Sequence, residues 1–166
     1  MASHETTHHC LIDSPLGPLL AVERGGKLLL LAFAGDDPPE VEPGWVESEA
    51  PFAELRAQLG EYFEGRRREF DLPIEPEGTE FQMAVWSALR DIPYGATATY
   101  GQVAEAIGRP TAVRAVGGAN NANRLSIVIP CHRVVGADGS LTGFGGGLEA
   151  KALLLELESG TVASGG

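Results

Sequence analysis

This chain of 166 residues has few cysteines and no long apolar run. Two cysteines, Cys10 and Cys131, cannot build a disulfide framework. No apolar run approaches the roughly 20 residues of a membrane-spanning helix. The N-terminus, MASHETTHHC, lacks the basic start and the apolar stretch of a secretory signal. We therefore expect a cytoplasmic protein, not associated with a membrane, whose cysteines serve in chemistry or in the core.

Basic residues are also scarce, since 12 Lys and Arg stand against 23 Asp and Glu, for a formal net charge of −11. The acidic excess is unevenly spread, because residues 1–78 carry −10 and residues 79–166 carry only −1. Strong negative charge argues against nucleic-acid binding by the first part, and near-neutrality removes that objection for the second. The asymmetry also indicates two modules.

The first part of the chain predicts a small β-sheet. Short apolar stretches over residues 8–34 are separated by turn formers, including the segment Ser14–Pro18 and the pair Gly25-Gly26. This pattern is typical of a β-meander or of hairpins. Residues 35–50 are acidic and rich in Pro and Gly, so we expect a loop there.

A helix is expected to follow the loop. Pro51 begins a stretch with apolar residues at three- and four-residue spacing, and Gly65 ends it. The basic run Arg66–Arg68 just beyond it is interpreted as a solvated cluster near a helix C-terminus. These elements make an N-terminal module over residues 1–72, which a linker over 73–78 joins to the rest.

The second part predicts three helices. Thr79 caps the first, which runs to about Leu89, and Thr99 caps the second, over Tyr100–Ile107. A tight turn containing Gly108 leads into the third, from Thr111 to about Ala119. Two short helices joined in this way are a helix-turn-helix candidate, although many helical hairpins bind nothing.

The third of these helices has an unusually bare surface, because it is rich in Ala and Gly and Arg114 is its one long charged side chain. A helix that reads the major groove usually carries several polar side chains that contact bases. A smooth helix with one Arg suits the minor groove, where little sequence can be read. Close packing against other helices explains the small residues equally well.

The main chemical signal lies at residues 126–136, SIVIPCHRVVG. We expect an apolar, strand-like run to deliver Cys131 at a bend set by Pro130. A free thiol has a pKa of about 8.5, so a nucleophilic cysteine needs an imidazole, a cation or a helix N-terminus to favour its thiolate. His132 is adjacent, but neighbours on an extended segment point to opposite faces. A buried, inert cysteine therefore remains open, and Cys10 is expected to be a strand residue.

The C-terminal residues 148–158 have helical composition throughout. Lys151 and Glu158 fall on one face of this helix together with leucine, so Glu158 could be partly buried and paired. An ordinary solvated glutamate is the alternative. This helix completes a C-terminal module over residues 79–158, which leaves residues 159–166 as a flexible tail.

Several motifs in residues 79–158 occur in a specific order and spacing. They are Ile92-Pro93-Tyr94-Gly95, Thr99-Tyr100-Gly101, Arg114-Ala115-Val116-Gly117, Asn123, Ile129-Pro130-Cys131-His132-Arg133-Val134-Val135 and Thr142-Gly143-Phe144-Gly145-Gly146-Gly147-Leu148. On these residues the chain resembles the O6-alkylguanine–DNA alkyltransferases, or methylated-DNA–protein-cysteine methyltransferases. The implied fold is α+β, with a small N-terminal β-sheet plus helix module. The implied C-terminal module is mostly helical and carries a helix-turn-helix and the Pro-Cys-His-Arg active site.

The resemblance implies a suicide DNA-repair enzyme that takes an alkyl group from O6 of guanine onto Cys131. His132 would be its base through a water molecule, and Glu158 would orient and charge-balance His132, which makes sense as a proton relay. Asn123 resembles the residue that holds the cysteine-bearing loop against the preceding helix. Tyr100 resembles the residue that crowds the target phosphate and helps guanine to leave.

The implied partner is double-stranded DNA that contains O6-alkylguanine. Arg114 resembles the finger that enters the base stack when the target base flips out. The other DNA or substrate contacts that we expect are Gly101, Arg109, Val134, Gly145 and Lys151. No cofactor is implied, and we expect a monomer in solution.

Two departures from the family pattern stand out. Gly145 lies in a run of glycines where some relatives carry a side chain, which suggests a more open pocket. Some members bind zinc through cysteines near the N-terminus, where this chain has only Cys10. The nearby His4, His8 and His9 are interpreted as a disordered or artificially added terminus, and no metal site is expected.

Two other classes of function remain open from the residues. A nonenzymatic alkyltransferase-like protein would bind alkylated DNA and flag it, but such proteins lack the acceptor cysteine. A cysteine hydrolase would also use Cys and His, but usually places them far apart in sequence. Detection of a stable alkyl adduct on the protein discriminates both classes from a transferase.

Overall fold

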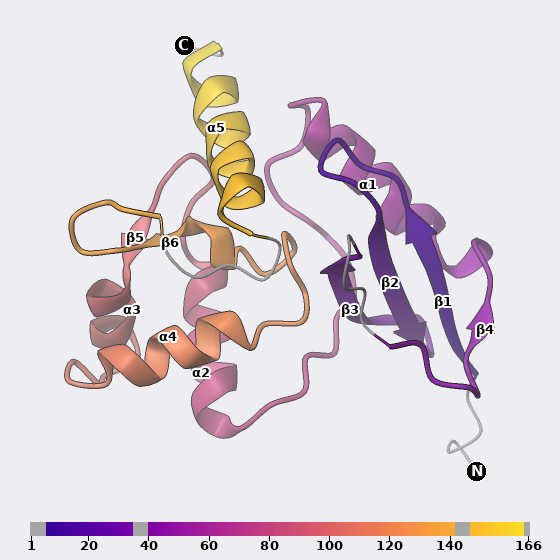
Figure 1. Cartoon of the computed structure of the whole chain (residues 1–166), viewed down its shortest axis with the longest axis horizontal. Coiled ribbons are helices and arrows are strands. Elements are labelled where there is room, and N and C mark those ends of the chain that lie inside the picture. Colours follow the sequence, from indigo (N-terminus) through magenta and orange to yellow (C-terminus); the bar gives the residue numbers. More distant parts are fainter. Residues whose placement is uncertain (1–5, 35–39, 142–146, 165–166) are drawn as a thin grey trace. The chain divides into compact units, whose positions relative to one another are not determined.

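The structure, a computed structural model, describes residues 6–34, 40–141 and 147–164 (Figure 1). The chain divides into two compact units, Met1–Pro76 and Glu77–Gly166. The division lies inside the segment 73–78. Among the residues that the structure describes, none of the helices combines the length and the apolar character that a membrane crossing requires.

The first unit contains a four-stranded sheet with the order β3-β2-β1-β4 (Figure 1). Its strands are β1 (Thr7–Ile12), β2 (Leu19–Arg24), β3 (Lys27–Phe33) and β4 (Val46–Glu47). The first three pair antiparallel in chain order, so the predicted meander is confirmed. Gly25 and Gly26 both have positive φ, at 61° and 84°, which a two-residue hairpin turn requires and which glycine adopts without steric cost. The short strand β4 adds in parallel to β1, within the predicted loop.

The predicted helix of this unit is confirmed as a short 3₁₀ turn, η2 (Ala50–Phe52), followed by α1 (Ala53–Phe63). Its apolar stripe buries Phe52, Leu55, Leu59 and Tyr62. The chain leaves the helix at Gly65, whose φ of 78° is the usual left-handed helix end. Beyond it, Arg66 and Arg67 pair with Glu64 and Glu61.

Part of the predicted linker belongs to the sheet. Ile74 forms a parallel bridge with Leu28, and backbone hydrogen bonds at 2.9 Å join Leu28 to Pro73 and to Glu75. β3 is an edge strand, and its unpaired backbone groups recruit this extended segment. Composition alone predicted a linker because these hydrogen bonds depend on backbone atoms and not on residue type.

The second unit is mostly helical. Its elements are α2 (Glu80–Arg90), β5 (Ala98–Thr99), α3 (Tyr100–Ala106), α4 (Val113–Asn121), η3 (Cys131–Arg133), β6 (Val134–Val135) and α5 (Leu148–Ser164). Thr79 and Thr99 cap α2 and α3 as predicted, each in a capping box with a glutamine three residues later. β5 and β6 pair in parallel, with Ala98 opposite Val134.

The predicted helix-turn-helix is present as α3 and α4, which pack together and against α2 (Figure 1). Gly108, with φ of 76°, turns the chain between them. Val116 and Ala119 are buried, and the indole N–H of Trp86 in α2 donates to the carbonyl of Ala119 at 2.9 Å. Ala115 and Gly118 lie exposed, so part of the bare surface predicted for this helix is presented to solvent, whereas Ala119 is buried.

The C-terminal helix is longer than predicted. α5 runs to Ser164 and so includes most of residues 159–166, which were expected to form a flexible tail. No proline follows Glu158, and the single Gly160 costs a helix about 1 kcal/mol, which does not end a helix that is already nucleated.

Candidate active site

Cys131 does not follow a strand. Residues 126–129 form tight turns, in which Val128 N donates to Ser126 O at 2.8 Å and Cys131 N donates to Ile129 O at 2.7 Å. Ile127 has φ of 73°, a strained conformation for a β-branched residue that costs about 1–3 kcal/mol. The extended run expected there was wrong, because a short apolar segment that is buried on all sides has no periodicity to identify it.

Asn123 ties this turn together. Its Nδ2 donates to the carbonyl of Ile129 at 3.0 Å, and its Oδ1 accepts from the backbone N–H of Leu125 at 3.0 Å. Asn120, in the last turn of α4, is buried, and its Nδ2 lies 3.5 Å from the carbonyl oxygen of Cys131. Asn120 in α4 and Asn123 just after it thus hold the cysteine segment, and of the two only Asn123 was predicted from the sequence.

Cys131 and His132 are the first two residues of η3. A 3₁₀ turn has about three residues per turn, so successive side chains lie about 120° apart and not on opposite faces. Cys131 is 5% exposed and His132 is 0% exposed. The objection to their cooperation, which holds for an extended segment, therefore does not apply.

Burial raises the pKa of the Cys131 thiol, while a hydrogen bond with Asn123 and the positive charge of Lys151 oppose that rise. Burial also lowers the pKa of His132, and its contact with Glu158 opposes that fall. Burial thus favours the neutral form of both groups.

His132 and Glu158 form a buried pair. His132 Nε2 lies 2.7 Å from Glu158 Oε2, and Glu158 is 1% exposed. Burial alone would raise the pKa of Glu158, but hydrogen bonds from His132 and Arg133 outweigh it and lower the pKa to about 2. Because an ionised carboxylate only accepts, Nε2 carries a proton, and in the neutral ring that burial favours Nδ1 therefore keeps its lone pair. Nδ1 is buried and has no hydrogen-bond partner among the described residues.

Arg133 is a third member of the group formed by His132 and Glu158, and it was not among the predicted site residues. Its Nε and Nη2 donate to the two oxygens of Glu158, at 2.9 and 3.0 Å, and its Nη1 donates to the carbonyl of Ile92 at 2.7 Å. The Arg133 guanidinium carbon lies 5.7 Å from the centre of the Tyr94 ring. The position of Arg133, two residues after the cysteine, was visible in the sequence, but no local pattern distinguishes a buried arginine from a solvated one.

Lys151 and Val134 are also buried in this unit. Lys151 is 0% exposed, and burial lowers its pKa. Val134, in β6, pairs with Ala98, so the backbone that follows the active-site turn runs beside the start of α3, where Tyr100 lies. The Tyr100 ring is 3.8 Å from the position that a Cβ would occupy on Gly117, so a small residue of α4 accommodates it.

Among the predicted DNA or substrate contacts, the two arginines lie at the surface. Arg114, in the first turn of α4, and Arg109, in the turn between α3 and α4, are exposed. The Arg109 guanidinium carbon is 6.0 Å from the centre of the Phe81 ring. Gly101 is half-buried in the first turn of α3. Gly145 lies outside the described residues.

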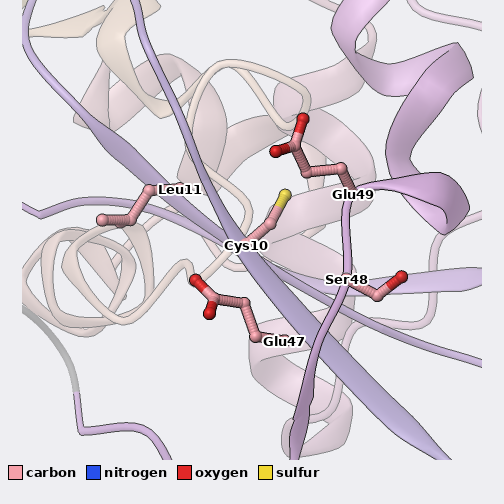
Figure 2. Close-up of a pocket in the computed structure, with 5 residues that line it drawn as sticks. All are labelled: Cys10, Leu11, Glu47, Ser48 and Glu49. Atoms are coloured by element: carbon pink, nitrogen blue, oxygen red, sulfur yellow. The ribbon is translucent and has the colours of Figure 1, made fainter.

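Cys10 has different surroundings in the first unit. It lies in β1 as predicted, 2% exposed, beside a cavity of about 450 Å³ that Leu11, Glu47, Ser48 and Glu49 also line (Figure 2). Burial raises the pKa of the Cys10 thiol. Arg56, whose Nη2 lies 3.9 Å from Cys10 Sγ, opposes this rise.

The histidines near Cys10 were expected in a disordered or added terminus, and for two of them this was wrong. His8 and His9 lie in β1, because this segment pairs with β2. His4 lies outside the described residues. Within residues 6–34, 40–141 and 147–164, no three His, Cys, Asp or Glu side chains are placed to hold a metal ion.

Comparison with known proteins identifies both units. Residues 80–160 match the family described as 6-O-methylguanine DNA methyltransferase, DNA binding domain. Residues 7–76 match the one described as 6-O-methylguanine DNA methyltransferase, ribonuclease-like domain.

Individual relatives agree over nearly the whole chain. The methylated-DNA–protein-cysteine methyltransferase of Methanosarcina acetivorans is 49% identical over 152 residues, which are 91% of this chain and 97% of the relative. The corresponding protein of Mycobacterium leprae is 48% identical, over 90% and 92% of the two chains. The crystal structure of Mycobacterium tuberculosis OGT in complex with DNA has a TM-score of 0.87 at 45% identity, over 93% of this chain and 94% of that one. This chain therefore belongs to the methylated-DNA–protein-cysteine methyltransferase family.

Proposed function

We propose that this protein repairs DNA by direct reversal, moving the alkyl group of O6-alkylguanine onto Cys131, once per molecule. The observation that carries the proposal is the buried His132, whose Nε2 is engaged by Glu158 while its Nδ1 has a lone pair and no partner among the described residues. A base of this kind beside a buried thiol can generate a thiolate at the moment of reaction. Membership of the methyltransferase family supports the same reaction.

The chemical step needs no cofactor. The Cys131 proton passes to His132 Nδ1, through a water molecule, and Glu158 stabilises the imidazolium. The thiolate then attacks the alkyl carbon, a carbon–sulfur bond forms, and the bond between that carbon and O6 breaks with its electron pair going to guanine. The base takes up one proton and becomes ordinary guanine. A thioether is not hydrolysed under mild conditions, so the protein is consumed.

The assigned residues support this step around the thiol. Asn123 would hold the turn that carries Cys131, and Lys151 would favour the thiolate electrostatically. The backbone of Val134 would read the polar edge of the flipped base, as would Gly145. Tyr100, at the start of α3, would crowd the target phosphate and help guanine to leave.

On the DNA side, α4 would enter the minor groove of a duplex. Its exposed surface is smooth around Ala115 and Gly118, which allows close approach of the backbone but little reading of sequence. Arg114 would fill the stack after the base flips out, and Gly101 and Arg109 would contact the backbone of the DNA. Extrusion is needed because O6 lies within the paired stack, and a lesion that weakens pairing lowers its cost.

Mass spectrometry of the protein mixed with a duplex that contains O6-methylguanine tests the proposal. We expect a stable gain of one methyl group per protein, on the peptide that contains Cys131, and none with undamaged DNA. Binding without modification would favour the alkyltransferase-like alternative. Multiple turnover without an adduct would favour a hydrolase. Sedimentation of the free protein tests the expected monomer.

A further inference from the structure

The guanidinium of Arg133 is a buried cation bonded directly to Glu158. Its two hydrogen bonds to the carboxylate are bidentate, and the third anchors it to the carbonyl of Ile92, after α2. The residue is 7% exposed. A buried cation with its donors directed in this way compensates a buried anion that would otherwise be costly.

Glu158 is shared between two consecutive residues. Its Oε2 accepts from His132 Nε2 at 2.7 Å and from Arg133 Nη2 at 3.0 Å. At rest, the negative charge of Glu158 is therefore already balanced by Arg133, and a proton on the second nitrogen of His132 is not required for charge balance. A further charged group that acts on His132 is Lys151, from α5.

We propose, resting on the function above, that Arg133 is a positioning residue that keeps His132 neutral at rest with its Nδ1 able to accept the Cys131 proton. Without Arg133, the buried Glu158 carboxylate would be balanced best by a second proton on the imidazole. His132 Nδ1 would then be a donor, and the relay would have no base. Both Arg133 and Lys151 oppose the imidazolium electrostatically, which agrees with a neutral resting imidazole.

The first test is the pH dependence of alkyl transfer from free O6-benzylguanine, which requires no DNA. Removal of a cation beside His132 raises the pKa of its imidazole, so we expect Arg133→Gln to be about tenfold slower than the parent at pH 6.5 and within about threefold at pH 8.5. Arg133→Lys, which keeps the charge but loses the bidentate geometry, should lie between them. The matched control is Arg124→Gln, an exposed arginine of the same unit, which should leave the profile unchanged. A loss that is equal at every pH would mean that Arg133 only supports the fold, and would overturn the proposal.

The second test reads the charge of His132 directly, by NMR of protein with ¹⁵N-labelled histidine, assigned with His132→Gln. We expect a neutral ring protonated at Nε2 in the parent at pH 7, and a charged ring in Arg133→Gln. A charged ring in the parent would overturn the proposal even if no Arg133 variant folds. Because this measurement involves no alkyl transfer, it also separates a failure of this proposal from a failure of the proposed function, which would appear as the absence of any adduct.

Discussion

Each unit of the protein contains a buried cysteine and a histidine hydrogen-bonded to a glutamate. In the first unit, Cys10 and His8 lie two residues apart on β1, and His8 Nδ1 is 2.6 Å from Glu23 Oε2. In the second unit, Cys131 is adjacent to His132, and the corresponding distance to Glu158 is 2.7 Å. By residue type and by distance the two sets are alike.

They differ in what surrounds the histidine. The side chains of His8 and Glu23 are 27% and 9% exposed, whereas those of His132 and Glu158 are 0% and 1% exposed. Glu23 accepts a backbone N–H from Gly26, whereas Glu158 is held by the guanidinium of Arg133. Water partly screens the His8–Glu23 pair, whereas the His132–Glu158 pair interacts more strongly because no water screens it. Deeper burial and the additional charged group Arg133 thus distinguish the candidate site from the similar set of residues in the first unit.

The largest difference between the two units is expected when each thiol is removed. Cys131→Ser should abolish alkyl transfer and leave DNA affinity largely intact, because serine keeps the shape but is a far weaker nucleophile near neutral pH. Cys10→Ser should be nearly silent. Adduct formation measured by mass spectrometry checks both variants. Residual stoichiometric transfer by Cys131→Ser would contradict the assignment of Cys131 as the alkyl acceptor.

The next largest difference is expected between substitutions of the two glutamates, Glu158 and Glu23. Glu158→Gln should slow transfer by about 100-fold, because it removes the charge that stabilises the imidazolium in a general-base step. Glu23→Gln should stay within about twofold, as expected of a partly exposed pair away from the chemistry. Single-turnover rates with O6-benzylguanine measure both. Equal losses would show that burial does not separate the two pairs.

The same carboxylate predicts how stability responds to acid. In the folded protein the pKa of Glu158 is lowered to about 2 from 4.5. The stabilisation that this carboxylate provides is therefore present at pH values above its pKa in the unfolded chain, and it is lost as the pH falls toward its pKa in the folded protein. Between pH 6 and pH 3 this loss amounts to about 2 kcal/mol. Urea unfolding should therefore show that the free energy of unfolding falls between pH 6 and pH 3 in the parent. In Glu158→Gln this fall should be smaller by about 2 kcal/mol. If both proteins lose the same amount, Glu158 is not ionised in the folded state.

Within the second unit, the proposed DNA-binding surface should be separable from the proposed chemical site. Arg114→Ala should slow repair of duplex DNA by about tenfold while the reaction with free O6-benzylguanine changes little, because a free base needs no flipping. Rates on the two substrates decide this. Similar losses on both would mean that Arg114 supports the fold or the cysteine.

The smallest effect should come from the basic cluster of the first unit. Arg66 and Arg67 already pair with Glu64 and Glu61, and residues 1–78 carry −10, so we expect this module not to grip DNA. Each neutralised phosphate contributes about −0.9 to the slope of log affinity against log salt. Neutralising Arg66, Arg67 and Arg68 should leave the shallow slope of an undamaged duplex unchanged. A slope that largely disappears would mean that the first unit binds DNA.

Much of the architecture was predictable because its signals are local. The caps at Thr79 and Thr99 and the glycines at 65 and 108 fix helix ends through hydrogen bonds and backbone angles that involve only neighbouring residues. The hairpin at Gly25-Gly26 is of the same kind. The motifs around Cys131 also indicate the family, because each of them is a short run of neighbouring residues in a specific order.

The environment of the chemical groups, by contrast, comes from the tertiary fold. The residues alone establish that Cys131, His132, Arg133 and Glu158 are present, and that Glu158 shares a helix face with Lys151. They leave open whether Glu158 is solvated, they assign Arg133 no role, and they predict an extended cysteine segment. In the observed arrangement, Glu158 meets His132 and Arg133 where water is excluded. These two residues lie 26 and 25 positions before it in the sequence. The strength of a charge pair is set by the dielectric and the donors around it, and those come from packing between distant segments that no local pattern encodes.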